Sequence, residues 1–163
     1  MPKIIRDRQL VDDNWQIQRD AEAEPLTPSE TQPVLIQVDE WQGAPYTAPW
    51  LASHTELNEQ LADRLKSATL IAIDFPDFND GRGYTLCRQL RERYQFKGEI
   101  RAIGDVLQDQ LYYMSRVGFT SFAIREDKDP EEALQGLNTF SVRYQAAQDE
   151  ATPLFRKRWE AST

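Results

Sequence analysis

The fold is decided by the stretch TLIAIDFPDFNDGRGYTLCRQLRERY, residues 69–94. Its first five residues form an unbroken apolar run of the kind found in strands that are buried on both faces of a sheet. A polar loop, DFPDFNDGRGY, follows directly. Gly83, Cys87, Leu90 and Tyr94 then recur at helical spacing, so residues 83–94 are predicted to be a helix with one buried face. The stretch therefore predicts one strand–loop–helix unit.

The same unit occurs four times along the chain. Predicted strands alternate with predicted helices, the strands at 34–38, 69–73, 100–104 and 119–125 and the helices at 53–65, 83–94, 108–117 and 127–145. Such alternation is typical of βα units with a mostly parallel sheet, an α/β fold. Strands in chain order would form half of a (β/α)-barrel, and a reordered sheet would be flavodoxin-like. The half-barrel arrangement is preferred, and the flavodoxin-like order stays open as the alternative.

Residues at the helix ends support these boundaries. Ser53 and Glu56 have the spacing of a capping box, which predicts that the first helix begins at Ser53. Gly118 is expected to end the third helix. Asp129 is the expected N-cap of the last helix, with Pro130 in its first turn.

The termini add a hairpin and a tail to the repeated units. KIIRDRQLVDDNWQIQRD, residues 3–20, predicts two short strands around a polar turn. The hairpin, or a second copy of the chain in a homodimer, is expected to cover an open edge of the sheet. We therefore expect a single domain, residues 1–163, built from a hairpin, a loop, the βα core and a tail (1–20, 21–33, 34–148 and 149–163).

Composition excludes several classes of protein. No apolar run approaches the roughly 18 residues that span a bilayer, and the N-terminal apolar stretch is too short for a secretory signal, so a cytoplasmic protein is expected. Cys87 and His54 are single, which excludes an internal disulfide, a cysteine-ligated cluster and multi-histidine metal sites within one chain. Cys87 is predicted to be a core thiol. The residues indicate no metal site and no resident cofactor.

The charge is unevenly distributed. A net charge of −8 argues against general binding to nucleic acid. Residues 81–101 nevertheless carry six bases against Glu92 and Glu99, namely Arg82, Arg88, Arg91, Arg93, Lys97 and Arg101. Two interpretations stay open, a solvated helix face and a surface for an acidic partner.

Candidate catalytic residues follow the predicted strands. Ligands of parallel α/β folds bind at the carboxyl ends of the strands. Carboxylates at these ends make Asp74, Asp77 and Asp105 the candidates for proton transfer or magnesium binding. Aspartates are also common helix caps and turn residues, which is the structural alternative. The residues at the four strand ends are Asp39, Glu40, Asp74, Asp77, Asp105, Arg125 and Glu126.

An anion site is the second hypothesis for the same edge. Asp80, Gly81, Arg82 and Gly83 form a tight turn before a helix, and Arg125 follows the fourth strand. Backbone amides and an arginine at a helix start can hold sulfate, phosphate or carboxylate. The turn lacks the third glycine of a dinucleotide fingerprint. A purely structural turn is the alternative.

The motifs DGRGY, LRER, GEIRAIGDVLQDQL and RVGF, within residues 78–124, resemble the bacterial domain-of-unknown-function 934 family. DDNW, YQ and PLFRKR extend the resemblance more weakly towards both ends. It implies a context of sulfite assimilation, because family members are labelled as oxidoreductases of sulfite reduction and are encoded beside a sulfite or nitrite reductase haemoprotein. The resemblance implies no catalytic residue. The positions that match the family pattern are Asp80, Gly81, Arg82, Gly83, Gly104, Asp105, Gln110, Arg116 and Gly118.

Two functions follow as expectations. The first is an accessory protein of assimilatory sulfite reduction that docks on the reductase or on its electron supply. The alternative is a small α/β enzyme that grips an anionic substrate at its strand ends, with Arg82 and Arg125 as the grip. A flavin or other cofactor bound in the same crevice without a sequence signature ranks behind both.

Overall fold

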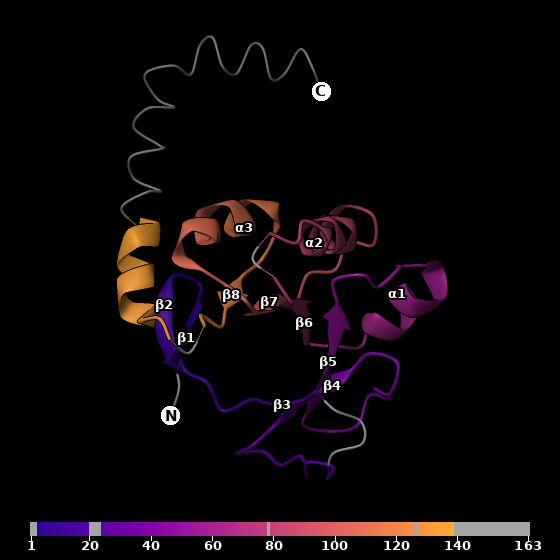
Figure 1. Cartoon of the computed structure of the whole chain (residues 1–163). Helices are drawn as coiled ribbons and strands as arrows, with labels where there is room; N and C mark the ends of the chain where they lie inside the picture. Colours follow the sequence, from indigo (N-terminus) through magenta and orange to yellow (C-terminus); the bar gives the residue numbers. More distant parts are fainter. Residues whose placement is uncertain (1–2, 20–23, 78, 126, 139–163) are drawn as a thin grey trace, which may run out of the picture.

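One eight-stranded sheet organises the chain in the computed structural model, which describes residues 3–19, 24–77, 79–125 and 127–138 (Figure 1). The strand order is β2-β1-β8-β7-β6-β5-β4-β3, and β3 to β8 are parallel neighbours in chain order. This confirms the half-barrel arrangement and excludes the flavodoxin-like order. The strands are β1 Lys3–Arg6, β2 Gln9–Asp12, β3 Gln16–Gln18, β4 Val34–Gln37, β5 Thr47–Ala52, β6 Leu70–Phe75, β7 Glu99–Gly104 and β8 Ser121–Phe122.

The helices line one face of this sheet. Figure 1 shows α1 (Glu59–Leu65), α2 (Arg82–Glu92) and α3 (Leu111–Val117) side by side on the same side, and the short η1 (Gln108–Gln110) leads into α3. Residues 130–138 are also helical. None of the described helices is long and apolar enough to cross a membrane.

Alternation along each strand divides the core between the two faces of the sheet. On the helix side, Ile71, Ile73 and Phe75 of β6 pack with apolar residues of α2 and α3. On the opposite side, Leu70 and Ala72 pack in a second cluster with Leu35, Ala48, Trp50 and Ile103. Both faces are buried, as the apolar strand sequences predict for a parallel sheet.

The predicted hairpin is confirmed for β1 and β2. Asp7 and Arg8 connect them with φ angles of 52° and 64°, the left-handed conformation of a type I′ turn. β1 pairs antiparallel with β8 and so covers that edge of the parallel strands. The prediction that the hairpin extends to residue 20 is wrong, because β3 pairs parallel with β4 at the opposite edge.

The segment between β2 and β3 therefore crosses the whole sheet. It runs along the face that carries no helices (Figure 1). Asp13 anchors it, since the carboxylate accepts a hydrogen bond of 3.1 Å from Nη1 of Arg101 in β7. Gln18 anchors its far end, where the main-chain carbonyl accepts a 3.1 Å hydrogen bond from the Trp50 indole. We call residues 13–19, which are the connection 13–15 together with β3 and Arg19, the crossing segment.

β5 is a strand that sequence patterns did not predict. Residues 39–52 lie between the predicted strand 34–38 and the predicted helix 53–65, and Pro45 and Pro49 argue for a loop there, because proline lacks the N–H that a central strand donates. Pro49 nevertheless lies within β5, opposite Ile36 of β4. The strand is retained because its apolar side chains are buried, Trp50 on one face and Leu51 on the other.

Helix ends agree with the sequence in two of three cases. Gly118 ends α3 with a φ of 127°, and Asp129 caps the last helix by accepting the N–H of Glu131. The predicted start of the first helix at Ser53 is wrong. Asn58 is the N-cap of α1, and its side chain accepts the N–H of Leu61 at 2.8 Å. The end of the predicted last helix, residues 139–145, and the predicted tail, residues 149–163, lie outside the described residues.

Replacing Arg101 by alanine tests the crossing segment. The guanidinium is only 2% exposed and lies 3.1 Å from Asp13 and 2.9 Å from Glu99. Its loss takes the cation from the partly buried Asp13 carboxylate and leaves Glu99 with only the longer 3.9 Å pair to Arg6, so we expect the free energy of unfolding to fall by about 3–5 kcal/mol. Urea unfolding measures this change.

Lys66→Ala is the control for Arg101→Ala. It removes an ion pair with Asp63 in which both side chains are well exposed, so the expected loss is at most about 1 kcal/mol. Equal losses in the two variants would contradict an anchoring role for Arg101.

Candidate functional site

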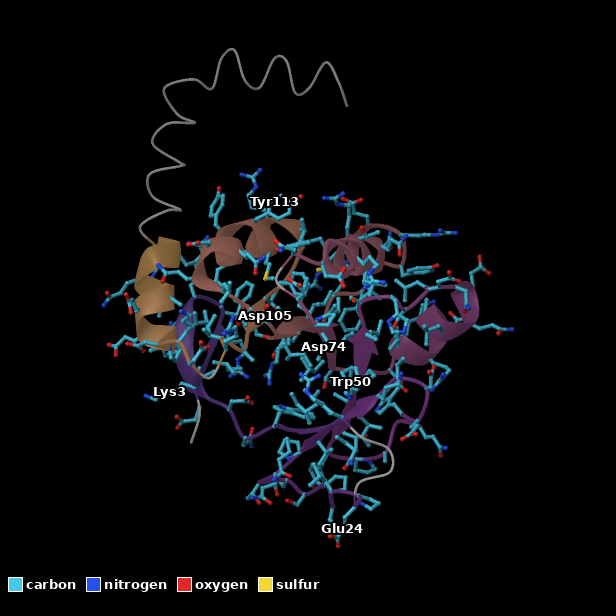
Figure 2. The ribbon with its side chains drawn as sticks, in the orientation of Figure 1. Lys3, Glu24, Trp50, Asp74, Asp105 and Tyr113 are labelled. Carbon is cyan, nitrogen blue, oxygen red and sulfur yellow. The ribbon has the colours of Figure 1, made fainter. Side chains whose placement is uncertain are left out.

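The candidate site is the edge of the sheet formed by the carboxyl ends of β5 to β8. Ser53 follows β5, Asp74 lies in β6, Asp105 follows β7 and Arg125 follows β8. Because these strands are parallel neighbours, their ends meet at one edge. Figure 2 labels Asp74 and Asp105 in the middle of this region.

Asp74 lies on the face of the sheet that the crossing segment covers. Its carboxylate accepts a 3.0 Å hydrogen bond from Nη2 of Arg19. The same guanidinium lies over the ring of Trp50, 5.8 Å from its centre. Gly104 has a φ of 89°, and a Cβ there would stand 2.5 Å from Oδ1 of Asp74. Asp74 therefore lies against the backbone of Gly104 and pairs with a cation that stacks on the Trp50 indole.

Asp105 belongs to a second ion pair. Its backbone N–H bonds to the carbonyl of Phe75 at 2.7 Å, which fixes the start of the loop after β7. Its carboxylate accepts from Nη1 of Arg125 at 3.0 Å. Arg125 also donates twice to Asp127, at 3.0 and 2.9 Å, and Asp127 foremost, with Asp105, raises the pKa of the guanidinium. Two carboxylates thus share the predicted anion-binding Arg125.

Asp80 is the centre of a third cluster. Arg82 donates to it from Nε at 2.9 Å and from Nη2 at 2.7 Å, and Ser53 donates from Oγ at 2.6 Å. The backbone N–H of Arg82, the first residue of α2, also bonds to this carboxylate at 3.0 Å, although the N-cap residue of the helix is Gly81. The hydrogen bonds from Arg82, then that from Ser53, hold the pKa of Asp80 well below its usual range.

Asp77 has a local role in the turn before α2. Its carboxylate accepts the N–H of Asn79 at 2.9 Å, and its main-chain carbonyl accepts the N–H of Asp80. This is the Asx-turn geometry that aspartate adopts in loops. The three predicted catalytic carboxylates therefore have different partners, and no metal-binding group of three or more His, Cys, Asp or Glu occurs among the described residues.

Two grooves flank the loop between β5 and α1. Each has a volume of about 500 Å³, and His54, Thr55 and Glu56 line both. One continues along α1 to Arg64, whose guanidinium already donates to the carbonyls of Val38 and Trp41. The other runs along the start of α2, where its lining includes Ser53, Arg82, Thr85 and Gln89. Ser53 and Arg82, two members of the Asp80 cluster, therefore line the second groove.

Comparison with known proteins gives one match. The family described as bacterial protein of unknown function, DUF934, matches residues 48–155, more than half of the chain. The chain belongs to this family. No curated protein and no solved structure matches it. The DUF934 match spans β5 to β8 and therefore includes the strand ends described above.

The basic residues among residues 81–101 have different partners in this DUF934 chain. Arg82 pairs with Asp80, and Arg101 is buried under the crossing segment. Arg91 is structural, since it donates to the carbonyls of Phe96, Gly98 and Gly118 at 2.8–2.9 Å. The exposed bases are Arg82, Arg88, Arg93 and Lys97.

Several residues of the site escaped prediction. Ser53 has the spacing of a helix cap but bonds to Asp80, 27 residues away. Arg19 meets Asp74 across 55 residues, and no local pattern signals that pair. Cys87, in contrast, is buried as predicted, and this burial raises the pKa of its thiol to about 12. His54 is exposed on the loop between the two grooves.

Alanine substitutions test whether Gly81 and Gly83 are required for different reasons. A Cβ at Gly83 would stand 2.5 Å from the ring of Phe75, which is fully buried and cannot move aside. We expect Gly83→Ala to lower the free energy of unfolding by about 1–3 kcal/mol through overpacking. Thermal or urea unfolding measures the change.

Gly81→Ala is the matched control, two residues earlier. Gly81 has a φ of −73°, and a Cβ there would meet nothing within 4 Å. Its expected change lies within about 0.5 kcal/mol. A larger loss from Gly81→Ala than from Gly83→Ala would show that the turn, and not the contact with Phe75, requires glycine.

Proposed function

We propose that this DUF934 protein is an accessory protein of assimilatory sulfite reduction, which acts by docking to the sulfite or nitrite reductase haemoprotein or to its electron supply. The sulfite context comes from the resemblance of its motifs. The observation that supports docking over catalysis is the internal pairing at the strand ends, where Arg19, Arg82 and Arg125 each already bind a carboxylate of the same chain.

This pairing disfavours a substrate grip. Arg82 presents both arms of its guanidinium to Asp80, at 2.9 and 2.7 Å, in the bidentate geometry that a bound oxyanion would need. Arg125 does the same to Asp127. A substrate anion has to displace these carboxylates before either arginine can hold it through the same two donors. A docking protein needs no such displacement.

Exposed arginines on an acidic protein suit a docking role. The chain carries a net charge of −8, yet Arg88 of α2 and Arg116 of the neighbouring α3 are exposed. Charge complementarity of this kind accelerates encounter with an acidic partner and makes the association rate depend on salt. The reductase would meet α2 rather than the acidic remainder of the surface.

Binding to the reductase from the same host tests the proposal. We expect biolayer interferometry to show a complex whose association rate falls about tenfold or more between 50 and 300 mM NaCl, because salt screens the exposed arginines. An absorption spectrum of the protein purified from its own host is the control. Absence of binding, a rate independent of salt, or a bound flavin or haem would overturn the docking proposal.

The second candidate function is anion binding by a small α/β enzyme, and the groove beside Arg82 favours it. This groove has polar walls that include Ser53, His54 and Thr85. Asp105 and Arg125 lie at the same edge of the sheet. The substrate in this case is a small oxyanion such as sulfite, sulfate or a phosphate ester.

Titration with sulfite, sulfate and phosphate tests this second function. If the groove binds anions, isothermal calorimetry should show saturable binding that Arg82→Gln weakens about tenfold or more, since the charged hydrogen bonds to the anion are lost. Arg93→Gln removes the same charge outside the groove and should leave the affinity unchanged. Equal losses in the two variants, or no saturable heat, would argue against the site.

A further inference from the structure

The outer surface of α2 and α3 gathers tyrosines and arginines. Tyr84 and Arg88 lie one turn apart on α2, and Tyr112, Tyr113 and Arg116 lie within α3. We call these five residues the tyrosine–arginine face. The two helices are adjacent on the same side of the sheet (Figure 1), so the five side chains come from neighbouring helices.

Aromatic contacts tie this face to the core. The rings of Tyr84 and Tyr113 meet edge to face, with their centres 5.2 Å apart. Tyr84 in turn meets the buried ring of Phe75 at 5.4 Å. Tyr113 is 53% exposed, among the most exposed large apolar residues in the described part of the chain, and Figure 2 shows it on the side of α3 away from the sheet. A rigidly supported ring is thus presented to solvent.

The arginines give the face its charge. α2 and α3 together contain Arg82, Arg88, Arg91 and Arg116 against the single acid Glu92, although the chain as a whole is acidic. Arg82 and Arg91 are held by Asp80 and by main-chain carbonyls. Arg88 is exposed, and no ion pair forms at its guanidinium within the described residues.

Arg116 is held in place by a neighbouring ring. Its Nη1 donates to Oη of Tyr112 at 3.1 Å, and its guanidinium lies 5.9 Å from the centre of that ring. A stacked, oriented guanidinium loses less side-chain entropy when it binds a carboxylate. Arg116 is therefore preorganised on the exposed surface of α3.

We infer that the tyrosine–arginine face docks onto an acidic surface of a partner protein. Tyrosine and arginine are the residues that most often dominate binding energy at protein interfaces. Arg88 and Arg116 pair with carboxylates of the partner, and Tyr113 fills an apolar pocket between them. A phosphate backbone is a poorer fit, because the net charge of −8 repels a nucleic acid around this small basic area. The inference rests on the proposed docking function and assigns the surface that performs it.

Charge reversal of the face tests the inference in the complex with the reductase. We expect the double variant Arg88→Glu and Arg116→Glu to weaken the Kd about thirtyfold or more, as the loss of interface hot spots does. Tyr113→Ala should weaken it to a similar degree. Arg93→Glu is the matched control, because Arg93 is exposed and stacks on Tyr94 beyond the end of α2. The melting temperature of each variant shows whether it still folds. If the charge reversals lower the melting temperature, the neutral double variant Arg88→Gln and Arg116→Gln is used in their place.

The outcomes distinguish a failure of the proposed binding surface from a failure of the proposed docking function. If the wild-type protein binds the reductase and the double variant binds equally well, the tyrosine–arginine face is overturned while the docking function stands. The same conclusion follows if Arg93→Glu weakens binding as much as the double variant does. If the reductase does not bind at all, the docking function fails, and the face is tested alone.

The separate test is an NMR titration with poly-L-glutamate as an acidic probe. We expect amide shifts centred on α2 and α3 that disappear in the double variant. Shifts elsewhere on the protein would overturn the face. Tighter binding of double-stranded DNA than of poly-L-glutamate at the same residues would overturn the acidic-protein partner.

Discussion

A single buried guanidinium holds the two edges of this fold together. Arg101 in β7 bonds to Asp13, Glu99 and Ser121, and its side chain is almost completely buried. A charge in that position is tolerable only because it has carboxylate partners and satisfied donors. The pair with Asp13 carries the chain across the helix-free face, so β1 and β2 can cover one edge while β3 extends the other. The crossing segment thereby takes the place that further strands occupy in a full barrel.

The same segment shapes the carboxyl edge of the sheet. Arg19 at its end reaches Asp74 and stacks on Trp50, which closes the inner side of that edge. On the outer side, Ser53, Asp80 and Arg82 join the end of β5 to the start of α2. In each of the two clusters an arginine pairs with a carboxylate, Arg19 with Asp74 and Arg82 with Asp80. A groove lined by Ser53, Arg82 and Thr85 is open to solvent on this side.

Sequence patterns predicted what depends on near neighbours. Apolar runs located β4, β6 and β7, and the helical spacing of Cys87 and Leu90 located α2, because burial of one face dictates these periods. Contacts between distant residues left no such trace. β5 was missed since Pro49 resembles a break, and Ser53 was assigned to a capping box although its partner is Asp80. The place of β3 at the far edge goes with the Asp13–Arg101 pair, which spans 88 residues and leaves no local pattern.

The arginine-rich region shows why the charge count alone could not decide between a solvated face and a partner surface. Three of its arginines serve the fold: Arg82 holds Asp80, Arg91 satisfies the carbonyls at the end of α3, and Arg101 anchors the crossing segment. Only the arginines left over can act on another molecule. On α2 that leaves Arg88, which shares its surface with Tyr84, Tyr113 and Arg116. The arginines at the strand ends, where catalysis would need a cation, are thus occupied by carboxylates of the same chain. Arg88 and Arg116 lie instead on a helix surface that a partner can reach.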